Sequence, residues 1–479
     1  MKKILLYVLV MLFLTAGMAV AADDEESWIE IGGDYRLRYD NLQGTVHDYV
    51  QITDAQRSLQ AVPGYDVKND SLFLNRFGLN VKAQATQNIS VKSRILMYKV
   101  WGHQSMGPAM GDYFMDRAYG PFDGTIGHVP ADSSLYWDQA YATWSNVGGA
   151  PVWIAAGRRP TTGGAPTNLR QNLDAGDPAG SSGIMMDYAF DGAVVGFSPK
   201  SDAMPGAYAK ISYGKGFDSG YVSNTSNQSE GLFFDLPNTL KDTDYIGIDV
   251  VPYNSNDLHI DLQVQKGYHI YSSFPDPDKV GMPPTPKKQD TANVGNITWW
   301  GGVIMGKVSN LHLFASVAQS KAEPNENNVG GVGLLWDTYH PESYNNGRDL
   351  EGYAVYVGGR FDITSTGTKI GAEYNQGTQY WIGQVPAGDD IWTSKLGTRG
   401  KVYEVYLIQE LNQKPIMKRG KAFLRAGYQY YKFDYTGSNN WMGAPVRISD
   451  LDLTNTANAQ GLAPVQSAKD LYVTFDVLF

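Results

Sequence analysis

The chain has 479 residues, with no cysteine, 53 glycines and 31 tyrosines, and its formal net charge is −10. The absence of cysteine excludes disulfide scaffolds, cysteine-ligated zinc or iron–sulfur centres and a thiol nucleophile. The negative charge argues against nucleic acid as a partner, because phosphates require a basic face. With 42% hydrophobic and 18% charged residues, the chain is too apolar to be disordered.

The first 22 residues have the features of a secretory signal peptide. Lys2 and Lys3 form a charged start, residues 4–14 an apolar stretch, and residues 19–22 a small-residue cleavage site. The apolar stretch is too short to cross about 30 Å of hydrocarbon as a helix. We therefore expect residues 1–22 to be cleaved and residues 23–479 to form the mature protein.

Alternation of apolar and polar residues is the dominant pattern of the mature chain. In residues 258–265 every even position is apolar and every odd position is polar. Most positions of residues 29–39 and 89–97 alternate as well, for example Ile89, Val91, Ile95 and Met97 against Ser90, Lys92 and Arg94. Segments of this kind match tilted membrane strands of roughly 10 residues. No later stretch approaches the roughly 18 apolar residues of a membrane helix, so the sequence favours a closed barrel.

The spacing of turns and loops predicts the number of strands. Seven short turns, most of them carrying Asn, Gly, Ser, Asp or Pro, alternate with eight long polar segments and so join sixteen strands. An eighteen-strand barrel is the alternative, if a long segment contains a hairpin. The predicted fold is all-β, a single antiparallel up-and-down transmembrane barrel with short periplasmic turns and long extracellular loops. The predicted strands are residues 28–40, 71–83, 89–101, 135–147, 151–159, 184–198, 207–217, 243–253, 258–270, 296–308, 311–321, 350–363, 368–381, 401–411, 421–435 and 468–479.

The last predicted strand and the aromatic residues point to the bacterial outer membrane. Apolar residues occupy every second position from Leu471 to Phe479, among them Phe475, Val477 and Phe479, with Tyr472, Thr474 and Asp476 between the earlier ones. This pattern resembles the C-terminal signature read by the barrel-assembly machinery of bacterial outer membranes. Aromatic residues near strand ends are typical of interfacial girdles. The residues expected in these girdles are Trp28, Tyr39, Tyr98, Trp101, Trp144, Trp153, Trp381 and Tyr435.

Inward-facing charges are the first candidate functional residues. Sixteen strands enclose a water-filled bore rather than a side-chain core, so function depends on the residues that line it. A basic wall would favour anionic solutes, whereas charges that pair across strands would only keep the wall polar. The basic residues expected on the inward face of the first three strands are Arg36, Arg38, Arg76, Lys82, Lys92 and Arg94.

Residues 160–183, between the fifth and sixth predicted strands, form the candidate constriction loop. Their prolines and adjacent glycines favour a tightly folded segment. In general porins the loop at this place folds inward. Arg159 and Arg170 would capture carboxylate or phosphate groups, and Asp174 and Asp177 would face them across the passage. The alternative is a compact surface loop whose arginines bind acidic loops or lipopolysaccharide.

Enzymatic chemistry has little support in the sequence. The seven histidines are scattered, and no zinc-protease motif, nucleophile elbow, calcium loop, phosphate-binding loop or haem-attachment motif is present. We therefore expect no enzyme activity, no cofactor and no specific metal site.

Four segments resemble an uncharacterised family of bacterial porin-like outer-membrane proteins. They are residues 97–102, 157–160, 187–192 and 213–217. Beyond residue 220 only the barrel pattern supports the match. The resemblance implies a barrel and transport, but no solute and no catalytic residues. A more distant resemblance is to barrels that export alginate, whose arginine-rich bore passes an anionic polysaccharide.

Two functional hypotheses from different classes follow. The first is an outer-membrane channel through which small hydrophilic solutes diffuse, with a preference for anions. The second is a plugged barrel that acts as an adhesin or a partner-docking protein, with a polysaccharide-export channel as a further alternative. The expected partners are the solutes, outer-membrane lipid and lipopolysaccharide, the barrel-assembly machinery and, in a homotrimer, two further copies of the chain.

Overall fold

A computed structural model describes residues 28–53, 58–102, 130, 133–161, 163–173, 183–186, 188–219, 240–273, 291–343, 348–385, 389–411 and 420–479. The predicted signal peptide, residues 1–22, lies outside these described residues and stays a prediction. Asp174 and Asp177 of the candidate constriction loop also lie outside them.

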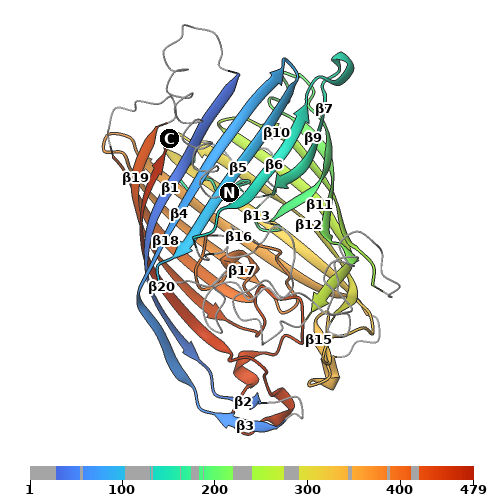
Figure 1. Ribbon diagram of the computed structural model, residues 1–479. Coiled ribbons are helices and arrows are strands. Elements are labelled where there is room, and N and C mark those ends of the chain that lie inside the picture. Colours follow the sequence, from blue (N-terminus) through green and yellow to red (C-terminus); the bar gives the residue numbers. More distant parts are fainter. Residues whose placement is uncertain are drawn as a thin grey trace, which may run out of the picture.

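Sixteen strands form one closed antiparallel barrel (Figure 1). Strand β1 pairs with β4 on one side and with β20 on the other, which closes the ring. The barrel strands are β1 (Ile29–Val46), β4 (Tyr65–Thr86), β5 (Ile89–Val100), β6 (Tyr136–Trp144), β7 (Val152–Pro160), β8 (Ala189–Phe197), β9 (Tyr208–Phe217), β10 (Thr243–Asn254), β11 (Leu258–Ser273), β12 (Thr291–Val308), β13 (Leu311–Pro324), β16 (Leu350–Ile363), β17 (Thr368–Gly377), β18 (Gly400–Glu410), β19 (Lys421–Phe433) and β20 (Val465–Leu478). The predicted fold class and the count of sixteen are confirmed.

The alternation in sequence becomes an apolar outside and a polar inside. On β20, Leu471 and Val473 are 51% and 43% exposed, whereas the intervening Tyr472 is 1% exposed. The same holds around the ring, because successive side chains of a strand point to opposite faces. Apolar surface this extensive is typical of a lipid-facing barrel wall. Among the described residues, no helix has the length and apolar character needed to cross a bilayer.

Two small hairpins lie outside the barrel sheet, within segments predicted as long loops. Strands β2 (Tyr49–Ile52) and β3 (Leu59–Val62) pair beyond the end of the barrel, at the bottom of Figure 1. Strands β14 (Val332–Gly333) and β15 (Trp336–Asp337) pair with each other. Neither hairpin joins the ring, so the eighteen-strand alternative is wrong. The predicted loop 41–70 is also shorter than expected, because β1 and β4 stay paired up to Val46 and Tyr65.

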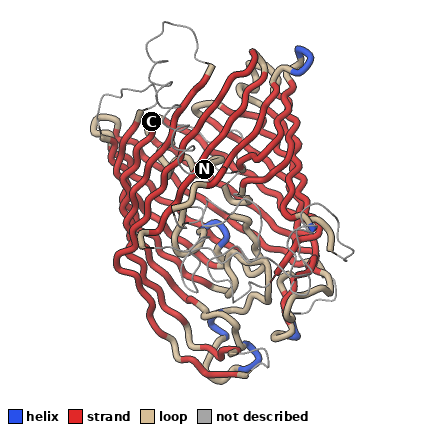
Figure 2. Tube along the Cα trace, viewed as in Figure 1, coloured by secondary structure: helices blue, strands red, loops and turns tan. Residues whose placement is uncertain are grey.

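Loop segments lie inside the ring of strands (Figure 2). We call the described residues 161, 163–173 and 183–186 the β7–β8 segment and the described residues 378–385 and 389–399 the β17–β18 segment. The second contains the short helix η6 (Lys395–Gly397). They cover an apolar inner wall formed by β8, β10–β13 and β16. The buried cluster includes Leu169, Met185, Tyr245, Trp299, Phe314, Tyr356, Trp381 and Leu396. The expectation of a water-filled bore without a side-chain core is therefore wrong for this part of the lumen.

The predicted aromatic girdles are only partly present. Trp28, Trp101 and Trp144 are 67%, 54% and 48% exposed, as expected for residues at a membrane interface. Trp381 is fully buried instead, because its strand ends at Gly377 and the tryptophan belongs to the β17–β18 segment. Tyr98 is 4% exposed and points into the lumen. Proximity to a strand end does not indicate which face of the strand an aromatic residue occupies.

Candidate functional site in the barrel lumen

One carboxylate in the lumen faces several arginines. Asp389 of the β17–β18 segment contacts Arg36 of β1, and its Oδ2 lies 3.0 Å from Nη2 of Arg425 on β19. Its backbone carbonyl accepts a hydrogen bond of 2.8 Å from Arg38. Burial alone would raise the pKa of Asp389, but the guanidinium groups, foremost those of Arg36 and Arg425, hold it well below its usual range. The ionised carboxylate therefore anchors the segment to β1 and β19.

The arginines around Asp389 also pair with carboxylates of the wall. Arg36 contacts Asp476 of β20, and Nη2 of Arg38 lies 3.2 Å from Asp470 of β20 as well as 2.6 Å from Asp40 of its own strand. Arg36 and Arg38 are 3% and 1% exposed. The interpretation that charges pair across strands therefore describes these two arginines, and they present little free positive charge to a solute.

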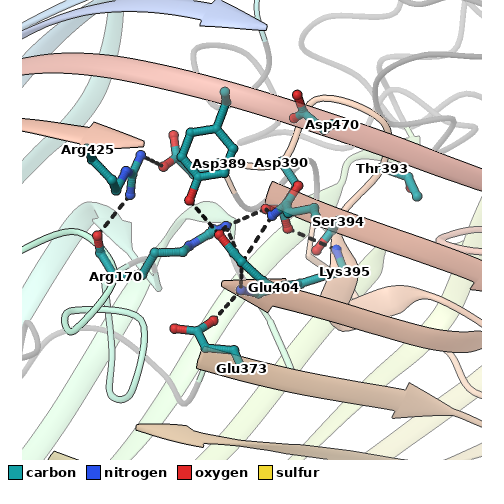
Figure 3. A network of polar contacts seen from close by, with 12 residues as sticks. Arg170, Glu373, Asp389, Asp390, Thr393, Ser394, Lys395, Glu404, Arg425 and Asp470 are labelled. Atoms are coloured by element: carbon teal, nitrogen blue, oxygen red, sulfur yellow. Dashed lines mark hydrogen bonds and ion pairs between the residues drawn. The ribbon is translucent and has the colours of Figure 1, made fainter. Parts of the chain in front are cut away.

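A second cluster of buried charges joins the two loop segments (Figure 3). The ammonium group of Lys395 contacts both Glu373 of β17 and Glu404 of β18. Nη1 of Arg170, from the β7–β8 segment, lies 2.6 Å from Asp390 and 3.1 Å from Glu404. All five side chains are at most 4% exposed. Buried charges of this kind are tolerated only when they are paired, so the cluster depends on both segments being in place.

Glycines on the inner wall make room for this arrangement. A Cβ atom on Gly44 of β1 would lie 2.3 Å from the ring of Trp392, which belongs to the β17–β18 segment. A Cβ on Gly427 of β19 would lie 2.3 Å from the ring of Tyr472, whose hydroxyl donates a 2.6 Å hydrogen bond to Glu404. Large side chains pack flat on the strands at these positions because the glycines have no side chain.

The β7–β8 segment crosses the lumen. Strand β8 lies eight places from β18 in the ring of sixteen, so the two strands are on opposite sides. Besides the pairing of Arg170 with Glu404 of β18, the carbonyl oxygen of Leu169 accepts a 2.7 Å hydrogen bond from Arg360 of β16. Nζ of Lys369, on β17, donates one of 2.7 Å to Asn172. The segment therefore reaches the wall opposite to the strands from which it starts.

Four of the predicted inward cations keep some exposure. Arg76 and Arg94 on β4 and β5 share Asp34 and are 23% and 15% exposed. Lys82 is 36% exposed and bonds Glu30 at 2.9 Å. Lys92 is exposed and, among the described residues, forms no ion pair. These four residues lie on β4 and β5, away from the contacts that Arg170 makes with β18.

Arg159 lies apart from Arg170. It is the penultimate residue of β7 and is 8% exposed. Its guanidinium carbon lies 5.2 Å from the ring centroid of Tyr141 and 5.6 Å from that of Trp153, a cation–π arrangement. Nζ of Lys92 lies 6.0 Å from the same Tyr141 ring. The structure therefore does not bring the two predicted loop arginines together.

The sequence interpretation missed Asp389, Asp390 and Lys395, because it assigned residues 382–400 to an ordinary polar loop. A signal was present. The stretch 381–396 carries Trp381, Ile382, Ile391, Trp392 and Leu396, all at most 3% exposed in the structure. A solvated surface loop does not need so many large apolar residues, so their density indicates a segment that packs inside the protein.

The C-terminal residues close the ring. The backbone N–H and carbonyl of Phe479 exchange hydrogen bonds of 3.0 and 2.7 Å with Gly33 of β1. The ring of Phe479 lies 6.4 Å from that of Phe77, and Phe475 is 36% exposed on the outer surface. Recognition of Phe475, Val477 and Phe479 by the assembly machinery stays a prediction.

The closed ring, the apolar exterior and the charged interior define a porin-like barrel of the bacterial outer membrane. The chain belongs to the family described as protein of unknown function (DUF3373), whose model matches residues 66–479. No curated protein matches the sequence.

Solved structures with a similar chain course include three outer-membrane proteins. OmpT of Vibrio cholerae has 10% identity and a TM-score of 0.42, over 95% of this chain and 99% of that one. OprB of Pseudomonas putida has 10% identity and a TM-score of 0.42, over 94% of each chain. An anion-selective porin from Comamonas acidovorans has the same identity and TM-score, over 95% of this chain and 100% of that one.

Proposed function

We propose that the protein is an outer-membrane channel for small hydrophilic solutes, narrowed by the β7–β8 and β17–β18 segments. The observation that carries the proposal is the path of the β7–β8 segment, which crosses a closed barrel and is held at the far wall by Arg170. A segment fixed in this way narrows the bore instead of folding over the outside. Selectivity then depends on charges along the remaining passage.

We further propose that the passage runs beside β4 and β5 and favours anions. The support is the partial exposure of Arg76, Lys82, Lys92 and Arg94 on these strands. Arg36 and Arg38, in contrast, are buried and paired, so they contribute to holding the β17–β18 segment in place. Passage beside a basic wall lowers the energy of an anion relative to a cation.

The substitution Lys92→Gln tests the anion preference. Reversal potentials are measured in planar bilayers across a potassium chloride gradient. The wild type should be anion-selective, and the variant should lose up to about fivefold of its anion-to-cation permeability ratio, because one partly screened charge is worth about 1 kcal/mol at close range. The control is Lys200→Gln, which removes an exposed lysine in the turn between β8 and β9. A cation-selective wild type rejects the preference, and the absence of any conductance rejects the channel.

A plugged barrel that displays its loops to a partner is the second candidate function. The observation in its favour is the apolar cluster inside the lumen, in which Met185 and Trp381 of the two loop segments are at most 1% exposed. Swelling of liposomes that contain the purified protein separates the two functions. A channel admits small sugars and swells the vesicles, whereas a plugged barrel excludes them.

A further inference from the structure

A cavity of about 590 Å³ lies among the long loops, outside the buried charge clusters. Residues of β2, of the segment around β14 and β15, and of the segment 434–465 form its walls. Trp392 and Thr393 of the β17–β18 segment also line it. Its volume lies within the range of sites for small organic ligands, about 300–1,000 Å³.

The described lining of the cavity offers no unpaired charge to a ligand. Among the lining residues that the structure describes, Asp337 and His340 are the only acidic, basic or histidine side chains, and they bond to each other, Oδ1 to Nδ1, at 2.8 Å. Burial opposes the charged form of both, but their mutual hydrogen bond lowers the pKa of Asp337 and raises that of His340. An ionic ligand would lose its hydration on entering and gain no counter-charge.

Polar side chains in the lining are largely engaged within the wall. Thr436 and Asn440 accept hydrogen bonds of 3.0 and 2.8 Å from the backbone N–H groups of Val446 and Met442. The Oγ atom of Ser438 accepts one of 2.9 Å from the backbone of Arg399. These bonds fix the shape of the cavity and occupy the oxygens of the three side chains as acceptors.

Apolar and aromatic side chains make up most of the remaining surface. Trp392, Phe433 and Tyr435 contribute rings, and Val332, Met442 and Leu462 contribute aliphatic groups. Aromatic and aliphatic surface of this kind binds a ligand by removing apolar area from water and by stacking.

We propose that this cavity is a binding site for small, uncharged, mainly apolar molecules, of the size of a two-ring aromatic compound. The proposal goes beyond the channel function and does not rest on it, because binding at the loops requires no open passage. The proposed cavity would select neutral apolar compounds, whereas the lumen is proposed to prefer charged solutes.

The experiment measures binding of 2-naphthol, which is neutral at pH 7, to protein in lipid nanodiscs by saturation-transfer difference NMR. Two leucines of the same loop provide matched variants. Leu462 lines the cavity and is 38% exposed, whereas Leu453 does not line it and is 37% exposed. Leu462→Asp should weaken binding at least about tenfold by placing a carboxylate against the ligand, and Leu453→Asp should leave it unchanged.

Three results would overturn the proposal. One is the same titration curve for the wild type and Leu462→Asp, which would place 2-naphthol in the lipid. Another is binding of 2-naphthoate, the anionic analogue, as tight as that of 2-naphthol. The third is stronger binding of sucrose than of 2-naphthol.

Because both leucines are exposed, the variants should fold, and heat-modifiable migration in gels verifies the barrel. Val332→Asp, at a second lining position, should reproduce the loss.

Discussion

Replacement of Asp389 by asparagine is expected to release the β17–β18 segment from the wall and to raise single-channel conductance. The substitution keeps the shape but removes the charge that Arg36 and Arg425 face. Asp389 has a left-handed backbone with φ of 69°, which asparagine also adopts readily. Breaking one side of a buried ion pair costs about 3–5 kcal/mol, so the detached state should become roughly 150-fold to 4,000-fold more populated.

Hydrogen–deuterium exchange over residues 389–399 measures this release directly, whether or not the barrel conducts. The control is Asp202→Asn, in an exposed turn between β8 and β9. Exchange and conductance that match the wild type in Asp389→Asn would contradict the anchoring role.

Because Asp389 stays ionised in moderate acid, we expect the β17–β18 segment of the wild type to remain attached to the wall there. Because its arginine neighbours lower the pKa of Asp389, its stabilising contribution is fully present above the ordinary carboxyl pKa and is lost only as the pH falls through the lowered value. Exchange over residues 389–399 should therefore be unchanged between about pH 8 and 5, apart from the intrinsic rate. Loss of protection within that range would show that other groups hold the segment.

Replacement of Arg170 by methionine is the second change with a large expected effect. Arg170 bonds Asp390 and Glu404 and so holds the β7–β8 segment against the far wall. Methionine preserves much of the apolar stem but leaves the two carboxylates without this partner, at a cost of about 3–5 kcal/mol. We expect residues 163–173 to lose exchange protection and the conductance to rise.

A matched arginine outside the lumen provides the control for this variant. Arg447 is exposed, and among the described residues its guanidinium contacts only the hydroxyl and the ring of Tyr435, so Arg447→Met should behave as the wild type does. The two lumenal variants should also differ in selectivity. Asp389→Asn removes a negative charge and should strengthen anion preference, whereas Arg170→Met removes a positive charge and should weaken it. A shift in the same direction in both variants would contradict the electrostatic account.

The part of the candidate site that lies on the strands could be predicted from the sequence, because residues on a strand alternate with a regular period of two. Arg36, Arg38, Arg76 and Arg94 follow the two-residue period of their strands, so their inward direction follows from the alternation alone. The burial of Arg36 and Arg38 was not predictable, because it depends on Asp389, which lies some 350 positions away from Arg36 in the chain. The two-residue period predicts which face of the strand a side chain occupies. It does not predict which distant segments of the chain contact that face.

The sequence by itself determined the barrel. Alternating strands separated by turn residues have one arrangement that pairs every backbone group and puts apolar side chains outward, and that arrangement needs only local information. The tertiary structure alone decided what fills the barrel. Whether the β17–β18 segment folds into the bore or over its rim depends on two sets of pairs. Asp389 pairs with Arg36 of β1, which is remote in sequence, and Lys395 pairs with Glu373 and Glu404 of the flanking strands β17 and β18. Such charge pairs form between particular atoms brought together by closure, and no local pattern encodes them.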